Sequence, residues 1–158
     1  MKRTTIIETI VFLYVILFLY TGISKLMEYE VFKENIAESP ILAFIATPIA
    51  LGLPWTEFAI TILLIIPRWR LKGLYASLVL MSLFTAYVIA ILLFDEHLPC
   101  SCGGILQQLS WPQHIVFNGV FILLATGGII LQRREKKAQQ TNWNNNEFRL
   151  QGQRKHSL

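Results

Sequence analysis

Charged residues are scarce in this chain. Only 15% of its 158 residues are Asp, Glu, Lys or Arg, 54% are hydrophobic, and the mean hydropathy is +0.50. Soluble domains carry about 25% charged residues, so this composition excludes an ordinary soluble protein. Several apolar runs have about 20 residues, the length that crosses a bilayer. We therefore expect a single-domain, all-α integral membrane protein with the lipid bilayer as its environment.

The chain also lacks the marks of other classes of protein. The first apolar run has no small-residue cleavage site before a polar region, so we interpret it as a retained membrane helix rather than a signal peptide. No internal repeat recurs at a fixed period. The net charge of +4 does not indicate nucleic acid, because the basic residues lie mostly beside apolar runs, where they fix membrane topology.

Four membrane-spanning helices are predicted within residues 1–131, at about 5–27, 41–66, 73–94 and 111–131. Together they predict a four-helix transmembrane bundle. Pro48 and Pro54 interrupt the second span, so we expect a helix kinked at proline, or a short outer piece followed by a main helix.

The segment 28–40, between the first two spans, is polar but places Phe32 and Ile36 four residues apart. This spacing predicts a short amphipathic helix at the outer membrane surface. At the other end of the chain, residues 132–158 are rich in Gln, Asn, Lys and Arg. This composition predicts a disordered cytoplasmic tail.

The distribution of charge predicts the orientation. The N-terminus, the 67–72 link and the tail hold twelve of the 14 Lys and Arg residues. Lys25, the 28–40 segment and the link between the third and fourth spans hold the other two, against six acids. By the positive-inside rule, both termini face the cytoplasm. The link between the third and fourth spans then faces the periplasm.

That periplasmic link holds the only two cysteines, Cys100 and Cys102. Thiols outside the cytoplasm meet an oxidising environment. A bridge between residues i and i+2 closes a small, strained ring, and strained bridges are easier to reduce. His97 and His114 lie nearby in sequence, and either could lower a thiol pKa or carry a proton during exchange. These four residues are the predicted catalytic site for thiol–disulfide exchange.

Other interpretations of the same link stay open. A Cys100–Cys102 bridge could have only the structural role of constraining the loop. Each histidine, taken singly, could be a residue at the membrane interface with no catalytic role. The two cysteines and two histidines could also form a four-ligand zinc set. However, C-x-C is not the usual zinc spacing and the histidines flank it at unequal distances, so we assign no metal site.

Glu57 and Asn118 are polar residues within predicted spans, and both are candidates for binding a cofactor. Glu57 lies about 13 Å deep by helical rise, and an ionisable residue at that depth is a functional candidate. Free amides after a helix break at Pro54 could bind its carboxylate. Lys25 is its expected ion-pair partner if the second span is kinked, and we favour a structural pair slightly over a proton relay. Asn118 shares a helix face with His114, so we expect packing first and ligand binding second.

Three short motifs carry a family resemblance over residues 5–131. They are Gly22-Ile23-Ser24-Lys25, Pro54-Trp55-Thr56-Glu57 and Cys100-Ser101-Cys102-Gly103-Gly104. In this order they resemble the MauE/DoxX-like membrane proteins. The resemblance implies a four-helix bundle of the bacterial inner membrane. For MauE it also implies disulfide formation or electron supply during maturation of methylamine dehydrogenase.

The arrangement is also similar to vitamin K epoxide reductase and other quinone-coupled disulfide enzymes. A quinone near Glu57 and the link is therefore the one candidate cofactor. This chain departs from those enzymes in having C-x-C rather than C-x-x-C and no second cysteine pair. These departures argue against direct coupling to quinone and imply that a partner protein supplies the second dithiol.

The leading hypothesis is an inner-membrane thiol–disulfide redox component, either a disulfide oxidoreductase or an electron relay. It would exchange the periplasm-facing Cys100–Cys102 disulfide with a periplasmic or inner-membrane partner protein. The alternative is a non-enzymatic accessory subunit of a membrane or envelope complex, in which the same bridge is structural. A third reading, a small-molecule or lipid carrier with its pocket at the kinked second span, has little support in the sequence.

Overall fold

The computed structural model describes residues 2–38, 42–94 and 111–156. These residues form α1 (Lys2–Met27), α2 (Tyr29–Ala37), the short 3₁₀ turn η1 (Ala43–Ile45), α3 (Ala46–Ile65), α4 (Arg70–Phe94) and α5 (Trp111–His156). The described chain is therefore all-helical. α1, α4 and α5, together with η1 and α3 as one span, are long and apolar enough to cross a membrane. This confirms the predicted all-α class and the four predicted spans.

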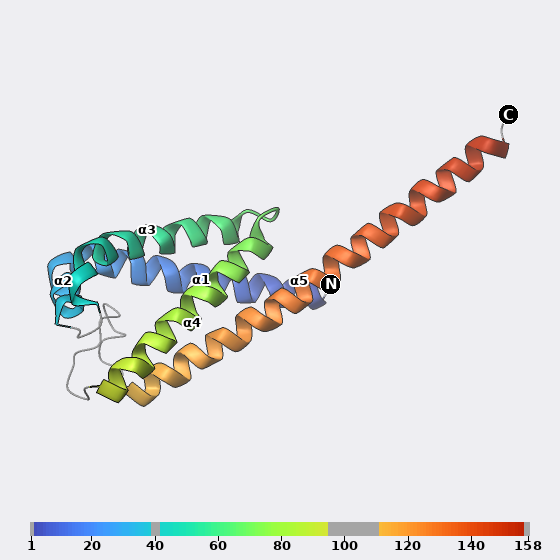
Figure 1. Ribbon diagram of the computed structural model, residues 1–158. Helices are drawn as coiled ribbons and strands as arrows, with labels where there is room; N and C mark the ends of the chain where they lie inside the picture. Colours follow the sequence, from blue (N-terminus) through green and yellow to red (C-terminus); the bar gives the residue numbers. More distant parts are fainter. Residues whose placement is uncertain (1, 39–41, 95–110, 157–158) are drawn as a thin grey trace.

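The four long helices form a closed bundle. α1 packs against α3 and α5, and α4 packs against the same two helices from the other side. α2 lies where α1 ends and α3 begins, and α4 ends and α5 begins at this same end of the bundle (Figure 1). We call it the α2 end. The N-terminus and the α3–α4 link lie at the opposite end, which we call the basic end.

Tyr14 lies at the centre of the core. Its side chain is fully buried, and its hydroxyl donates a 2.6 Å hydrogen bond to the carbonyl oxygen of Phe121. The two rings meet edge to face at 5.2 Å, which ties α1 to α5. The other buried apolar residues of this core are Ile7, Ile10, Val11, Phe18, Ile60, Leu64, Leu74, Met81, Ala125 and Ile129. Large apolar side chains such as Phe12 and Leu123 are exposed on the outside, where a bilayer would cover them.

The two prolines of the second span have different positions. Pro48 lies in the first turn of α3, where a backbone N–H has no partner within the helix to lose. Pro54 lies inside α3 and is buried, and its missing N–H leaves the Ala50 carbonyl without its usual donor. The span thus consists of η1 followed by one main helix, which is one of the two expected forms. A kink at Pro54 stays a prediction.

A helix forms in the polar segment between the first two spans, as α2. Phe32 and Ile36 are its buried side chains and pack against Ala46 and Ala50 at the start of α3. The acidic side chains on its other face are exposed. α2 therefore rests on the bundle through the two residues that the sequence singles out, and its position at a membrane surface stays a prediction.

The C-terminal segment differs from the disordered tail expected for residues 132–158. α5 continues from the bundle to His156 and projects well beyond the other helices (Figure 1). From Lys136 onward its side chains are exposed wherever their burial is described, so tertiary packing does not hold it. Residues 132–140 consist only of Gln, Arg, Glu, Lys and Ala, which are good helix formers, and a helix that already exists extends without a new nucleation step. The expectation of disorder considered burial alone and missed this local propensity.

Gly73 sets the closest approach of α3 and α4. A Cβ atom at this position would lie 2.9 Å from the backbone nitrogen of Leu64 and 3.0 Å from the carbonyl carbon of Leu63. These are backbone atoms, so relief of the contact requires the two helices to separate.

We predict that Gly73→Ala lowers the free energy of unfolding by about 1–3 kcal/mol through this overpacking. Gly52→Ala and Gly127→Ala are matched controls, because nothing lies within 4 Å of a Cβ at either position. They should leave stability unchanged or raise it by up to about 1 kcal/mol through helix propensity. Reversible unfolding of the purified variants in mixed micelles measures both effects. Equal stability of Gly73→Ala and the two controls would contradict the prediction.

Candidate functional site

Lys25 and Glu57 form a buried ion pair between α1 and α3. Lys25 Nζ lies 2.8 Å from Glu57 Oε1, and the two side chains are only 4% and 6% exposed. The same Nζ donates to the Thr21 carbonyl oxygen at 3.4 Å and lies 5.7 Å from the centroid of the Phe32 ring on α2. The structure thus brings together the two residues that the sequence suggests as partners across the first two spans.

Two short motifs build this contact. Gly22 lets α1 approach α3, because a Cβ atom there would lie 3.0 Å from Phe58 Cε1 and 3.3 Å from Glu57 Oε2. Lys25 follows three residues later, on the same face of α1. Pro54 precedes Glu57 by the same spacing and is also buried. In both motifs the two residues are about one helical turn apart and therefore lie on the same face of their helix. Each helix thus turns a buried charge and the small or cyclic residue before it toward the other helix.

The carboxylate of Glu57 does not bind free amides after a helix break. α3 is continuous from Ala46 to Ile65, so the amides that follow Pro54 lie within a helix and do not turn toward this side chain. The expectation of a break at Pro54 was wrong for this reason. The ammonium group of Lys25 takes the place that the amides were expected to fill.

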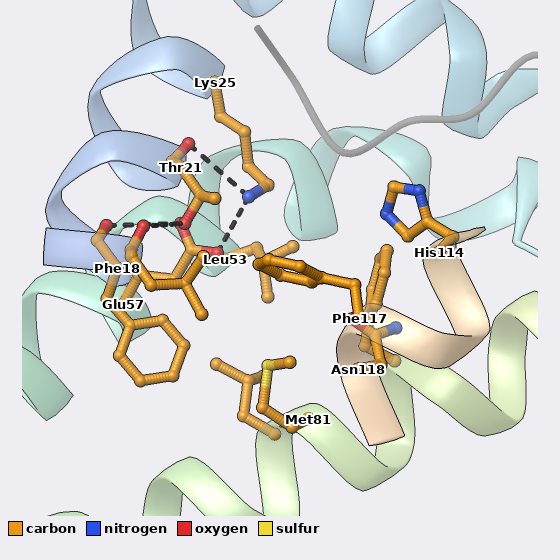
Figure 2. Close-up of a pocket in the computed structure, with 12 residues that line it drawn as sticks. Phe18, Thr21, Lys25, Leu53, Glu57, Met81, His114, Phe117 and Asn118 are labelled. Carbon is orange, nitrogen blue, oxygen red and sulfur yellow. Dashed lines mark hydrogen bonds and ion pairs between the residues drawn. The ribbon is translucent and has the colours of Figure 1, made fainter. Parts of the chain in front are cut away.

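His114 and Asn118 lie on α5, one turn apart, and both point into the bundle. The two residues are only 1% and 2% exposed. The centroid of the His114 ring lies 6.0 Å from that of the Phe84 ring. Figure 2 shows Lys25, Thr21 and Glu57 on one side of a cavity and His114 and Asn118 on the other. The sequence placed these two α5 residues on one helix face, and that face is turned toward the ion pair.

The cavity between these groups has a volume of about 50 Å³. Its walls are formed by Leu17, Phe18, Thr21, Lys25, Leu53, Glu57, Leu80, Met81, Phe84, His114, Phe117 and Asn118. Two buried atoms in these walls, Glu57 Oε2 and Asn118 Nδ2, have no hydrogen-bond partner among the described residues. One water molecule needs roughly 10–15 Å³. The cavity therefore has room for a few waters, which can donate to the carboxylate and accept from the amide.

A quinone does not fit this cavity. Pockets that take organic ligands have volumes of about 300–1,000 Å³, whereas this one has about 50 Å³. Most of its walls are packed apolar side chains from the bundle core. Glu57 and Asn118 are therefore not in a quinone site as the helices are packed, and we derive no step through a quinone.

His97, Cys100 and Cys102 lie outside the described residues. α4 ends at Phe94 and α5 begins at Trp111, so the connection that contains them starts and ends at the α2 end (Figure 1). Within the described ranges, no three residues among His, Cys, Asp and Glu are grouped so that they could hold a metal. Of the four-ligand zinc set considered above, only His114 belongs to those ranges.

Sequence reasoning missed Thr21 and Phe32 as parts of the site. Thr21 is buried four residues before Lys25, and its hydroxyl donates to the Leu17 carbonyl at 3.0 Å. A hydroxyl one turn before the lysine, on the same face of an apolar helix, was a usable signal. The sequence predicted that Phe32 lies on the buried face of its helix, but it did not indicate that the ring would lie over the ammonium group of Lys25. That contact depends on the turn between α1 and α2.

A model of the family described as methylamine utilisation protein MauE matches residues 3–131. The chain belongs to the MauE family. The match spans the four membrane helices, the ion pair and both cysteines, and it stops where the projecting part of α5 starts. It confirms the family resemblance given by the three motifs. No curated protein and no solved structure shows a significant match to the chain. We therefore describe a multi-pass membrane protein of the MauE family.

In this MauE-family protein we predict that Lys25→Met lowers the free energy of unfolding by about 3–5 kcal/mol, because it leaves Glu57 buried without its cation. The double variant Lys25→Met/Glu57→Met should recover most of this loss, since both desolvated charges are then gone. Reversible unfolding in micelles, combined as a double-mutant cycle, measures the coupling.

The exposed pair of Lys33 and Glu30, at 3.6 Å, provides the control. Lys33→Met should change stability by less than about 1 kcal/mol, as exposed ion pairs do. If the double variant were as unstable as Lys25→Met alone, the contribution of Lys25 to stability would not come from its pairing with Glu57.

Proposed function

We propose that this protein is an inner-membrane thiol–disulfide redox component whose Cys100 and Cys102 exchange a disulfide with an envelope protein. One observation carries the proposal: the only two cysteines of the chain fall in the connection between α4 and α5. Both anchors of that connection are at the α2 end, where the buried polar site lies. The bundle would thus present the pair from a fixed end. The printed role of the family, methylamine utilisation, makes a protein of that process the proposed partner.

The separation of charge supports an orientation with the cysteines outside. Lys2, Arg3 and the α3–α4 link lie at the basic end, from which α5 also carries its seven Lys and Arg residues away from the bundle. The α2 end instead carries the acidic side chains of α2 and its flanks. By the positive-inside rule, the basic end would face the cytoplasm. Cys100 and Cys102 would then face the periplasm, where disulfides persist.

The proposed exchange needs two cysteines here and two in the partner. A partner thiolate attacks one sulfur of the Cys100–Cys102 disulfide, forms a mixed disulfide and releases the other cysteine as a thiolate. The second thiol of the partner, as a thiolate, then breaks the mixed disulfide. The partner is oxidised by two electrons, and Cys100 and Cys102 gain those electrons together with the two protons that the partner thiols give up. A second envelope disulfide restores the pair by the reverse exchange.

Histidines have an assisting role in this proposal. His114 lies in the first turn of α5, three residues after the start of the helix that ends the connection. It also lines the cavity that contains Glu57. It is therefore the described histidine through which a proton would pass between the cavity and the thiols. His97, within the connection itself, is the second proposed helper of thiol ionisation.

One observation favours the second candidate function, an accessory subunit of an envelope or membrane complex. The projecting part of α5 exposes Trp143 and Phe148, which are 69% and 79% exposed. Large aromatic side chains are enriched at protein interfaces. In this alternative the projecting helix binds the partner, and a Cys100–Cys102 bridge only constrains the connection.

We predict that one of the two single variants, Cys100→Ser or Cys102→Ser, accumulates a mixed disulfide with a partner in native membranes. The thiolate of the remaining cysteine can attack a disulfide of the partner, but no neighbouring cysteine resolves the mixed disulfide. Non-reducing electrophoresis after acid quenching and thiol blocking reveals the adduct as a band that disappears on reduction. Ser101→Ala, which keeps both thiols, and the double variant Cys100→Ser/Cys102→Ser should show no such band.

The result against exchange is equally specific. If neither single variant traps a partner and the wild-type bridge resists a mild thiol, the pair is a structural clamp. Truncation of α5 after Leu131 then separates the two functions. Loss of a co-purifying partner in the truncated protein, with the cysteines intact, would support the accessory subunit.

A further inference from the structure

A basic groove lies where α5 leaves the bundle, beside the start of α4. It has a volume of about 480 Å³, and its walls are Leu71 of α4 with Ile130, Arg133, Arg134, Lys136 and Lys137 of α5. Four cations thus fall within five consecutive residues around a single hollow. The groove is at the basic end, at the opposite end of the bundle from the end of α4 and the start of α5.

The charge of this groove is not balanced by the protein. Glu135 is the one acid among the four cations, and it accepts a 2.9 Å hydrogen bond from the Thr4 hydroxyl on α1. None of the salt bridges formed by the described residues involves the four groove cations. Arg133 lies 5.3 Å from the centroid of the Tyr75 ring, a contact that orients the guanidinium without neutralising it. The groove therefore has a net positive charge.

The other walls of the groove are apolar and continue into the membrane-spanning surface. Ile130 is exposed on the last apolar turn of α5, and Leu71 lies in the first turn of α4. The groove thus joins an apolar wall to a cluster of cations at the level where the span ends. A ligand that matches both parts has a hydrocarbon chain and an anionic head. Guanidinium groups suit phosphate oxygens because they can donate two parallel hydrogen bonds.

We propose that this groove is a binding site for an anionic phospholipid, with the phosphate among Arg133, Arg134, Lys136 and Lys137 and an acyl chain along Ile130 and Leu71. A free phosphate would match the cations but would leave the apolar wall uncovered, so the lipid is the better match. Basic pockets between membrane helices on the cytoplasmic side bind such head groups. The site does not depend on the cysteines, so it stands or fails separately from the proposed redox function.

The test compares two full-length variants that lose the same charge at the same end of the bundle. Arg133→Gln/Lys137→Gln removes groove cations, whereas Arg68→Gln/Lys72→Gln removes exposed cations that do not line the groove. Each purified protein, in a neutral detergent, is titrated with phosphatidylglycerol, and bound lipid is counted by native mass spectrometry. The groove variant should bind about 30-fold more weakly than wild type, and the control variant should stay within about threefold.

Three arms decide the ligand. Phosphatidylglycerol should saturate at one molecule per chain, and zwitterionic phosphatidylcholine should bind at least tenfold more weakly. Glycerol phosphate, which carries the head without the chains, should not displace the lipid. Equal losses in the groove and control variants would overturn the site in favour of general surface charge. Displacement by glycerol phosphate would overturn the lipid in favour of a soluble phosphate compound.

Discussion

The pairing of Lys25 with Glu57 fixes how α1 and α3 fit together. Two opposite charges, 2.8 Å apart and nearly without solvent exposure, sit among apolar side chains. Removing either charge from water is unfavourable, and only a close partner offsets that loss. A slide of α1 along α3 by one turn, about 5.4 Å, would separate the charges. Apolar packing alone is less selective among such registers, because lipid tails can replace any one apolar contact. The ion pair therefore specifies the arrangement that Gly22 and Pro54 permit.

The sequence was sufficient for those features that depend on length, hydropathy and turn spacing. The four spans followed from apolar runs, and Lys25 was singled out as the partner of Glu57 on the condition of a kinked second span. Features that depend on local helix propensity or on the detailed packing of side chains were not predicted. The helical form of residues 132–140 follows from local propensity in the absence of burial, which a composition argument does not weigh. The cavity near Asn118 is small because Phe84, Phe117 and Met81 fill the space that a quinone would need, and side-chain packing of this kind is not visible in a sequence.

The two ends of the bundle differ in charge and in what they anchor. At the α2 end, a helix that is acidic outside and apolar inside covers the buried pair, and the cysteine connection begins and ends there. At the basic end, cations surround the place where α5 leaves the bundle. The MauE family match ends at residue 131, before most of these cations. The family match therefore covers the bundle and both cysteines, and the four groove cations lie beyond it.

α5 is a single helix of 46 residues, so its rise makes it about 69 Å long. The hydrocarbon core of a bilayer is only about 30 Å thick. The helix is therefore more than twice as long as a bilayer core is thick, so much of it lies beyond any span that its apolar part forms. The fold thus joins the end of the bundle that anchors the cysteine connection to a helix end that lies well beyond the opposite end of the bundle.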